Sequence, residues 1–311
     1  MNCLVTGSSG FIGKRLVLAL RQKRHTVKEF DLSNNKSVQN KQLLAQEMQG
    51  VDIVFHLAGE LDEKSPSLFE SNVQGTKNAV EAAAEQHVKQ FIFTSSVGVM
   101  GDIQAMADEQ TPLNPKTNYE KSKAEAEKLV LSYQEVLPVT IVRPAVVAGP
   151  NKDWKKIVEM IEKNAPLIGD GSNKWQTVYV DDLVDALVFL AGNEDAFGET
   201  FIVSESTPKT LREIAEFVRK KKGMQGDLKT MPVWLARITA LIAGLMGKKN
   251  FFSNEIIDRT IRLRHYSTKK INKLGWRARH STFEALEKTI EELEQNNENK
   301  KNYAGGTKKS A

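Results

Sequence analysis

The chain has 311 residues, of which 40% are apolar and 27% are charged, and these proportions exclude fibrous and wholly disordered proteins. Its single cysteine excludes an internal disulfide framework or a thiolate metal cluster and favours a reducing compartment, so we expect a cytoplasmic protein. The formal net charge is +5, but residues 296–311 hold four lysines and one glutamate, which leaves about +2 elsewhere and gives no case for nucleic-acid binding.

The N-terminus has no features of a secretion signal. Met1 and Asn2 lead directly into an apolar run, with no basic segment and no cleavage site. The longest apolar stretch, residues 233–246, is interrupted by Arg237 and is too short to span a bilayer. We therefore predict no transmembrane segment and interpret this stretch as a buried or interfacial helix, with attachment to a lipid surface as the alternative.

The first 144 residues alternate short β-rich runs with stretches of helical periodicity. Because the runs are almost continuously apolar and helices separate them, we predict a parallel sheet with helices on both faces. The predicted strands are residues 2–6, 26–30, 52–57, 90–94, 139–142 and 199–203. The predicted helices in this part include residues 12–23, 73–87 and 120–136.

After about residue 145 helices dominate, at residues 155–163, 182–191, 211–222, 234–246, 254–263 and 283–294, and a short run at 176–180 is predicted to return toward the sheet. We predict an α/β fold, a Rossmann-type doubly wound parallel sheet with a smaller, mainly helical C-terminal substrate lobe. The sheet domain comprises residues 1–144 with a returning segment 176–203, and the lobe comprises 145–175 and 204–295. Residues 296–311, rich in Asn, Lys and Gly, are predicted to be disordered.

Between the first predicted strand and helix, residues 6–13 read Thr-Gly-Ser-Ser-Gly-Phe-Ile-Gly. Glycines at these positions let the backbone turn tightly and let a pyrophosphate approach without meeting a Cβ atom. The N-terminus of the following helix then offers unpaired N–H groups to the phosphates. A position between a strand and a helix is the context that such a motif requires. We predict that an NAD(P) diphosphate binds at Gly7, Gly10, Phe11, Ile12 and Gly13.

The second predicted strand is followed by Asp31, about twenty residues after the glycine loop. A carboxylate there can bind both ribose hydroxyls of NAD and would repel the 2′-phosphate of NADP. Asp31 therefore favours NAD, with NADP as the alternative cofactor.

Tyr119 and Lys123 are four residues apart in a helical segment, which places both side chains on one helix face. A nearby ammonium lowers the pKa of a tyrosine, which is ordinarily about 10, so Tyr119 can serve as a general base or acid. Lys123 can also hold the ribose of the nicotinamide half. The predicted strand 90–94 ends at Ser95 and Ser96, at the carboxyl edge where parallel sheets bind ligands, and a hydroxyl there can orient the substrate oxygen.

Together these features resemble the extended short-chain dehydrogenase/reductase family, over roughly residues 2–294. Any one of the matching segments is weak evidence, but they follow one another in the family's order, which is highly specific. The segments are Thr-Gly-Ser-Ser-Gly-Phe-Ile-Gly from Thr6, His-Leu-Ala-Gly from His56, Asn-Val-Gln-Gly-Thr from Asn72, Thr-Ser-Ser from Thr94, Tyr-Glu-Lys-Ser-Lys from Tyr119, Arg-Pro from Arg143, Val-Tyr-Val-Asp-Asp from Val178 and Leu-Gly-Trp from Leu274.

The resemblance implies a Rossmann-type domain and a Ser/Tyr/Lys triad. The family's serine lies five residues before a glycine that closes a Ser-x-x-x-x-Gly run. Here that glycine is Gly101, so the resemblance implies Ser96, with Ser95 as the second candidate. It also implies that further residues contact the cofactor, beneath it or near its nicotinamide half. These residues are Leu57, Ala58, Gly59, Asn72, Thr94 and Pro144.

The chain departs from the family's pattern in three places. Residues 32–50 are polar and then helical, where most members have a third strand followed by an acidic pair. Met100 replaces the usual tyrosine before Gly101. No asparagine follows Arg143 and Pro144 until Asn151, which argues against a sugar nucleotide and favours the hydroxysteroid- or dihydroflavonol-like branch.

We therefore predict an oxidoreductase that transfers a hydride between NAD(P) and a secondary alcohol or ketone of a small molecule, with a hydroxysteroid- or dihydroflavonol-like substrate. A nucleotide-sugar 4-epimerase or dehydratase is the first alternative, and a non-catalytic NAD(P)-binding sensor or assembly protein is the second. No histidine has ligand spacing, so we predict no metal site. The resemblance implies a homodimer formed through the predicted helices 73–87 and 120–136.

Overall fold

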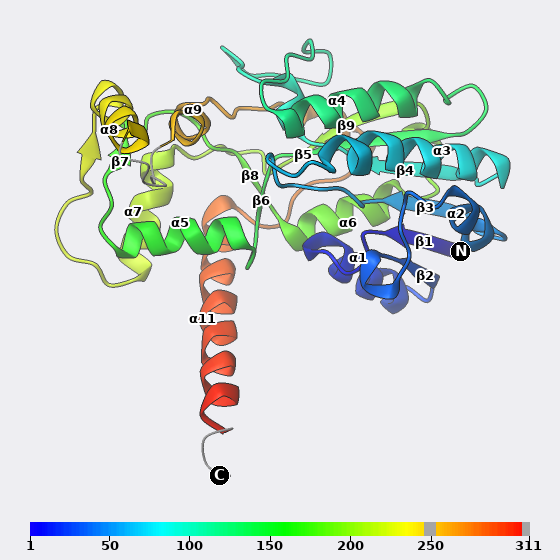
Figure 1. The fold of residues 1–311 in the computed structure, drawn as a ribbon, viewed down its shortest axis with the longest axis horizontal. Coiled ribbons are helices and arrows are strands. Elements are labelled where there is room, and N and C mark those ends of the chain that lie inside the picture. The colour runs from blue at the N-terminus through cyan, green and yellow to red at the C-terminus, as the bar shows by residue number, and fades with distance from the viewer. Residues whose placement is uncertain (246–252, 307–311) are drawn as a thin grey trace. The chain divides into compact units, whose positions relative to one another are not determined.

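A computed structural model describes residues 1–245 and 253–306, with side chains described up to residue 296. The chain forms two compact units (Figure 1). The first comprises Met1–Ala145, Val180–Ser204 and Tyr266–Ala278, and the second comprises Val146–Tyr179, Glu205–His265 and the residues from Arg279 onward.

The first unit contains a six-stranded parallel sheet with the strand order β2-β1-β3-β4-β5-β9. The strands are β1 (Asn2–Thr6), β2 (Thr26–Phe30), β3 (Ile53–His56), β4 (Gln90–Thr94), β5 (Val139–Pro144) and β9 (Glu199–Val203). All six predicted strands are present. The chain leaves β1 toward β2 and returns to β3 on the other side of β1, so the order reverses there. Ligands bind at the carboxyl ends of the strands at such a reversal.

Helices cover both faces of this sheet (Figure 1). Helices α1 and α6 pack together on one face, and α2, α3 and α4 pack on the other. The helices of this unit are α1 (Phe11–Gln22), α2 (Lys41–Met48), α3 (Gly75–Glu85), α4 (Asn118–Leu131), α6 (Val180–Leu190) and α10 (Lys269–Leu274). Short 3-10 turns lie at η1 (Leu32–Asn34), η3 (Val97–Met100) and η4 (Glu194–Ala196), and a π-helical turn, η2 (Glu70–Gln74), leads into α3.

Burial on both faces explains the continuous apolar runs of the strands. Leu4, Val54 and Phe91 pack in one cluster with the apolar sides of α2, α3 and α4. Their strand neighbours, such as Val5 and Phe55, point to the opposite face and are also fully buried. The core thus lies on both sides of the sheet and holds its carboxyl edge in place.

Residues 32–52 contain no strand. The turn η1 ends at Asn35, which is in the left-handed region, and Asn40 then caps α2 by accepting a hydrogen bond from the Leu43 amide. The third strand that most members of the family have at this point is therefore missing here. As a result, β2 is an edge strand of the sheet.

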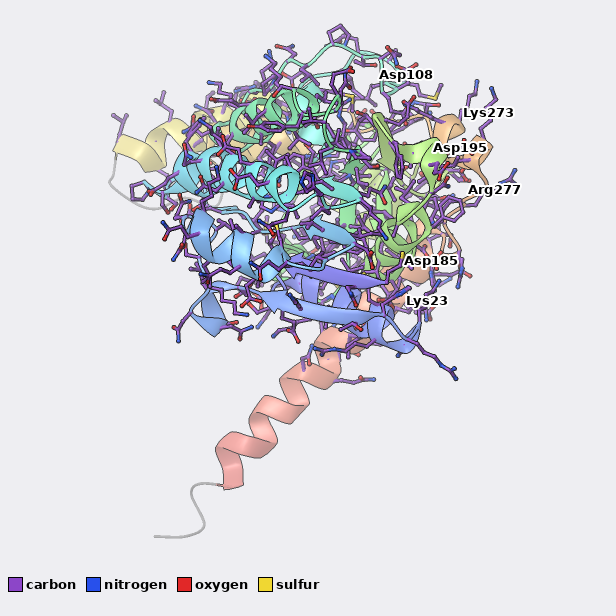
Figure 2. All side chains as sticks on the ribbon, turned by 90° about the vertical axis from the view of Figure 1, so that its right-hand side faces the viewer. Lys23, Asp108, Asp185, Asp195, Lys273 and Arg277 are labelled. Atoms are coloured by element: carbon purple, nitrogen blue, oxygen red, sulfur yellow. The ribbon has the colours of Figure 1, made fainter. Side chains whose placement is uncertain are left out.

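Residues 266–278, which we predicted in the substrate lobe, belong to the first unit. Lys270 of α10 forms an ion pair with Glu199 of β9 and lies 5.1 Å from the ring centre of Phe201. Trp276 donates a hydrogen bond to Asp185 of α6. Figure 2 shows Asp185, Lys273 and Arg277 on the same side of the molecule. The prediction was wrong because these contacts join α10 and Trp276 to β9 and α6, which are distant from them in the sequence.

The second unit contains two small parallel pairs of strands, β6 (Val146–Ala148) with β8 (Thr177–Tyr179), and β7 (Leu167–Ile168) with β10 (Thr230–Met231). The predicted run at 176–180 therefore does not return to the main sheet, because it pairs with β6 instead. The helices of this unit are α5 (Lys152–Glu162), α7 (Leu211–Lys221), α8 (Val233–Leu245), α9 (Asn254–Ile261) and α11 (Thr282–Gly306).

Helix α11 continues to Gly306, so residues 296–306 are helical where we predicted disorder. The sequence from Gln295 to Ala304 contains no glycine or proline, and Gly305 is the first helix-breaking residue. Residues 307–311 of the predicted tail lie outside the described residues. No helix in the described ranges has the length and apolar character needed to cross a membrane.

Candidate active site

The glycine loop is packed so closely that side chains are excluded from it. Gly7 has φ +69°, and a Cβ atom there would lie 2.7 Å from the Ala58 amide nitrogen. A Cβ atom on Gly13 would lie 2.1 Å from the Gly7 carbonyl oxygen. The loop therefore lies directly against the turn after β3, as the two glycines predict.

The N-terminus of α1 has donors available for an anion. Its N-cap, Gly10, makes no side-chain capping bond, and the first turn has no acidic residue. The first amides of a helix, here including those of Phe11 and Ile12, have no intrahelical acceptor. The buried Ser8 hydroxyl also has no hydrogen-bond partner among the described residues. These groups fit the diphosphate of a dinucleotide.

Asp31 lies beside this loop at the end of β2. Its carboxylate accepts hydrogen bonds from the Ser9 hydroxyl (2.5 Å), the Ser9 amide (3.2 Å) and the Ser33 amide (2.9 Å). Burial raises the pKa of Asp31, but the bonds from Ser9 and Ser33 outweigh it and hold the pKa below its usual value. The ionised carboxylate is thus fixed next to the glycine loop, at the position where dinucleotide-binding folds hold a ribose.

Asn72 joins the turn after β3 to helix α4. Its side-chain oxygen accepts from the Glu60 amide (2.7 Å), and its nitrogen donates to the Ser122 hydroxyl (2.9 Å). A Cβ atom on Gly59 would lie 2.9 Å from the same Asn72 oxygen. Asn72 lies in the π-helical turn η2, a distortion that is frequent at functional sites. The segment 57–59 is therefore held between the glycine loop and α4.

Tyr119 and Lys123 lie in the first two turns of α4. The helix begins with a capping box in which Thr117 and Glu120 hydrogen-bond reciprocally. This capping box fixes the start of the helix and therefore the position of Tyr119 in its first turn. The Tyr119 amide also donates to a Glu63 carboxylate oxygen at 2.9 Å. Glu63 was not predicted, because it lies in a polar loop without a motif.

The Lys123 amine is buried at the carboxyl end of the sheet. Its Nζ atom lies 4.2 Å from the ring centre of Phe93, the residue before Thr94. Desolvation lowers the pKa of Lys123 to about 7, and the charge of Glu127 only partly opposes this. Perturbed amines of this kind are common at functional sites.

His56 is a structural residue at the end of β3. Its two ring nitrogens hydrogen-bond the hydroxyls of Thr6 (2.8 Å) and Thr76 (3.0 Å), and its ring packs beside Phe91 and Phe93. Burial, and then the Lys123 charge, lower the pKa of His56 to about 3. The neutral ring thus links the end of β3 to Thr6 of β1 and to Thr76 of α3.

Three hydroxyls follow one another at the end of β4. The Ser96 hydroxyl caps η3 by accepting a bond from the Gly98 amide at 3.0 Å. The Thr94 and Ser95 hydroxyls are buried and have no hydrogen-bond partner among the described residues. A Cβ atom on Gly98 would lie 3.0 Å from Glu120 Cγ, so this turn packs against the start of α4. Two unsatisfied hydroxyls therefore lie at the end of β4, just before the turn η3 that packs against the start of α4.

At the end of β5, Pro144 follows a buried ion pair that the motifs did not reveal. Arg143 Nη2 lies 2.7 Å from a carboxylate oxygen of Glu127, one helical turn after Lys123, and Arg143 Nε bonds both oxygens. Arg143 also donates to the Glu109 carbonyl, and the Glu109 carboxylate accepts from the Ile202 amide of β9. The loop after η3 is thereby tied to α4 and to the sheet.

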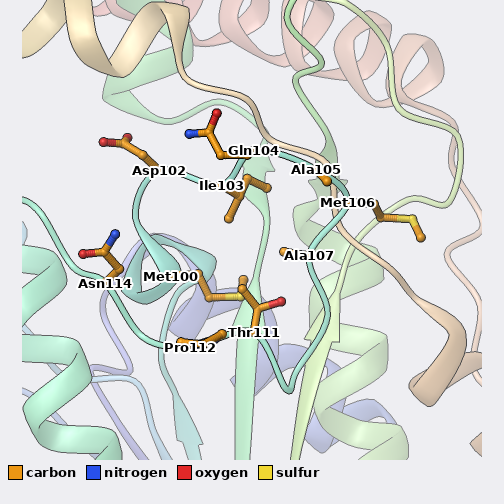
Figure 3. A pocket seen from close by; sticks show the side chains of 10 residues that line it. All are labelled: Met100, Asp102, Ile103, Gln104, Ala105, Met106, Ala107, Thr111, Pro112 and Asn114. Atoms are coloured by element: carbon orange, nitrogen blue, oxygen red, sulfur yellow. The ribbon is translucent and has the colours of Figure 1, made fainter.

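That loop lines an open pocket of about 300 Å³ (Figure 3). Its wall is mixed: it includes Met100, the residue that replaces the family's tyrosine, and polar atoms come from Asp102, Gln104, Thr111 and Asn114. Figure 3 draws Met100, Pro112 and Thr111 at the lower edge of this pocket and Asp102 and Gln104 at its upper edge. Asn151, by contrast, caps α5 in the second unit by accepting bonds from the Asp153 and Trp154 amides.

Lys123 should make the stability of the cofactor-free protein depend on pH. Because its folded pKa of about 7 lies below the ordinary 10.5, the unfolded chain binds more protons between these pH values, and stability rises with pH across that window. We expect the free energy of unfolding to gain about 2 kcal/mol from this residue between pH 7 and pH 9.

Urea unfolding of the wild type and of Lys123→Met at both pH values measures this contribution to the free energy of unfolding. The variant should lack the gain, while other titrating groups cancel in the difference. Equal pH dependence of the two proteins would show that the Lys123 amine is not desolvated.

Comparisons with known proteins give one family. A sequence model described as the NAD dependent epimerase/dehydratase family matches residues 3–204. The N-acetyl-alpha-D-glucosaminyl-diphospho-ditrans,octacis-undecaprenol 4-epimerase of Escherichia coli O157:H7 is 26% identical, over 93% of this chain and 94% of its own. The 3 beta-hydroxysteroid dehydrogenase/Delta 5-->4-isomerase of Mycobacterium tuberculosis (strain CDC 1551 / Oshkosh) is 27% identical, over 71% of this chain and 70% of its own.

Among solved structures, the dTDP-glucose 4,6-dehydratase DesIV of Streptomyces venezuelae, with NAD and TYD bound, is similar with a TM-score of 0.78 and 23% identity. The alignment covers 95% of this chain and 98% of that one, so the two share a fold.

Proposed function

This chain belongs to the NAD-dependent epimerase/dehydratase family, whose members are enzymes of the short-chain dehydrogenase/reductase type, and we propose that it oxidises a secondary alcohol carbon of a small-molecule substrate with Tyr119 as the general base. One observation carries this proposal. Tyr119 and the buried Lys123 share a face of α4, and two buried hydroxyls without partners, those of Thr94 and Ser95, lie at the end of β4, just before the turn η3 that packs against the start of this helix.

The cofactor is NAD, which when bound supplies a hydride acceptor, or in its reduced form a donor. We propose that the glycine loop and the α1 amides bind its diphosphate, and that Asp31 binds the adenine ribose. Leu57, Ala58 and Gly59 would form the floor of the site, and Asn72 holds this floor in place. We assign Thr94 and Pro144, at the ends of β4 and β5, to the nicotinamide half.

The chemistry follows from three side chains. The Tyr119 phenolate would take the proton of the substrate hydroxyl as the carbon–hydrogen bond breaks and the carbonyl forms. A Lys123 ammonium one helical turn away stabilises that phenolate. Ser96 would hold the substrate oxygen beside Tyr119, and Ser95 remains the second candidate because its hydroxyl is free to donate.

Asp31 should decide between the two nicotinamide dinucleotides. Because its carboxylate is ionised and would repel a 2′-phosphate, Asp31→Ser should weaken NADH binding by about tenfold, the cost of one charged hydrogen bond, and improve NADPH binding. Fluorescence titration with both cofactors measures this change. Glu29→Gln, two residues before Asp31 on β2 and with its carboxylate paired to Arg21, is the control and should change neither affinity. Unchanged NADH affinity in Asp31→Ser would remove Asp31 from the site.

For the substrate, we infer a sugar linked to a diphosphate, converted by epimerisation or dehydration. The sugar 4-epimerase relative aligns over almost its whole length, whereas the hydroxysteroid dehydrogenase relative aligns over 70% of its own.

A hydroxysteroid- or dihydroflavonol-like alcohol is the second candidate. It is favoured by the apolar stretch Ala145-Val146-Val147-Ala148, in which Val146 and Val147 are half-buried. Turnover of UDP-glucose and UDP-N-acetylglucosamine with catalytic NAD separates the two. An epimer formed without net NADH supports the first proposal. Inert sugar nucleotides, together with stoichiometric NADH from a hydroxysteroid, would replace it with the second.

A further inference from the structure

Helix α8 presents large apolar side chains to solvent at helical spacing. We call this set the α8 stripe, and Trp234 and Leu241, each 64% exposed, and Leu245, 81% exposed, are its most open members. Most exposed apolar residues on proteins are isolated, whereas a continuous patch marks an interaction surface. The stripe consists of Trp234, Leu235, Ile238, Leu241, Ile242 and Leu245.

The opposite face of α8 is the one that packs inside the second unit. Ala236 is fully buried in a cluster with Ile168 and Ile257, and Val233 and Ala240 are partly buried against the same cluster. The helix is therefore anchored by its smaller side chains while its largest ones point outward. This arrangement is the reverse of an ordinary surface helix, whose large apolar residues face the core.

The charge of the surrounding sequence favours an anionic partner. Residues 228–245 contain Lys229 and Arg237 and no acidic residue, and the sequence of residues 246–252, which lie outside the described residues, adds Lys248 and Lys249. Asp227 and Glu255 flank this basic range. Within α8, Arg237 pairs with Asp258 of α9 at 2.6 Å. Aromatic and aliphatic side chains accompanied by lysine and arginine are typical of helices that bind at membrane surfaces.

We propose that the α8 stripe binds the surface of a bilayer containing anionic lipids, with α8 lying parallel to the membrane plane. A 13-residue helix is about 20 Å long and cannot cross the roughly 30 Å hydrocarbon core. A protein interface carries about one hydrogen bond per 100–200 Å². The stripe has one polar group, the indole N–H of Trp234, and Arg237 and Thr239 are the other polar side chains of α8. A bilayer therefore fits this face better than a second copy of the chain does.

The test uses the full-length protein and vesicles of phosphatidylglycerol mixed with phosphatidylcholine, with pure phosphatidylcholine vesicles for comparison. The other tryptophans, Trp154, Trp175 and Trp276, are all less than 10% exposed, so Trp234 should dominate any environmental change. We expect a blue shift of tryptophan fluorescence and co-flotation with the anionic vesicles, both weaker with phosphatidylcholine.

The double variant Leu241→Gln/Ile242→Gln should reduce the affinity for anionic vesicles by at least about tenfold, because two exposed aliphatic side chains that would be buried in the bilayer are lost. Leu245→Gln should reduce it less, and it keeps the proposal testable if the double variant unfolds. Leu18→Gln on α1 removes an isolated residue of similar exposure and should change nothing.

Three outcomes would overturn the proposal. They are no flotation of the wild type, flotation that persists unchanged in folded α8 variants, and a dimer in sedimentation that the α8 variants convert to a monomer. The last outcome would assign the stripe to a second copy of this chain. None of these readouts depends on the substrate or on turnover.

Discussion

Replacing Tyr119 with phenylalanine should lower kcat by about 10²- to 10⁴-fold, the range for loss of a general acid–base group. The ring would still fill its place on α4, because the capping box and the Glu63 contact involve backbone atoms and other side chains. NADH affinity should therefore remain within about threefold of the wild type, because the contacts that bind the cofactor do not depend on proton transfer by the Tyr119 hydroxyl.

The measurement is a turnover assay together with a cofactor titration on the same preparation. Tyr133→Phe is the matched control, because its hydroxyl contacts Glu81 at 3.3 Å, two residues after the end of α4. It should leave kcat unchanged. If Tyr119→Phe were as active as Tyr133→Phe, then Tyr119 would not be the base and the proposed mechanism would fail.

The sheet was predictable from the sequence because each strand is buried on both faces. Runs such as Phe91-Ile92-Phe93 have no polar face, and helices of ordinary length separate them, so the parallel topology follows from local pattern alone. The order of the motifs along the chain then located the glycine loop, Asp31 and the pair on α4. These features depend on residues close together in sequence.

Features that depend on distant pairings were missed. The three residues of β8 pair with β6, and nothing in the run 176–180 distinguishes that partner from the main sheet. Likewise, Glu127 reads as one more charge on a helix, and its burial depends on Arg143, which is sixteen residues away on β5. An arginine within the apolar run Val139–Pro144 was the signal that could have indicated a buried partner.

The Arg143–Glu127 pair should be one of the most sensitive points for stability. Both groups are almost fully buried, and removing one charge leaves the other without its partner in the interior. Arg143→Met and Glu127→Leu should each lower the free energy of unfolding by about 3–5 kcal/mol. The double variant should recover much of this loss, because it removes both charges.

Urea unfolding of the four proteins in this cycle gives the coupling between the two residues. The control is Glu216→Gln, which breaks the exposed Arg212–Glu216 contact of 3.6 Å on α7 and should cost less than about 0.5 kcal/mol. Losses that simply add in the double variant would mean that each side chain acts through packing alone. A coupled pair instead explains how β5 holds α4, and with it Tyr119 and Lys123, at the carboxyl edge of the sheet.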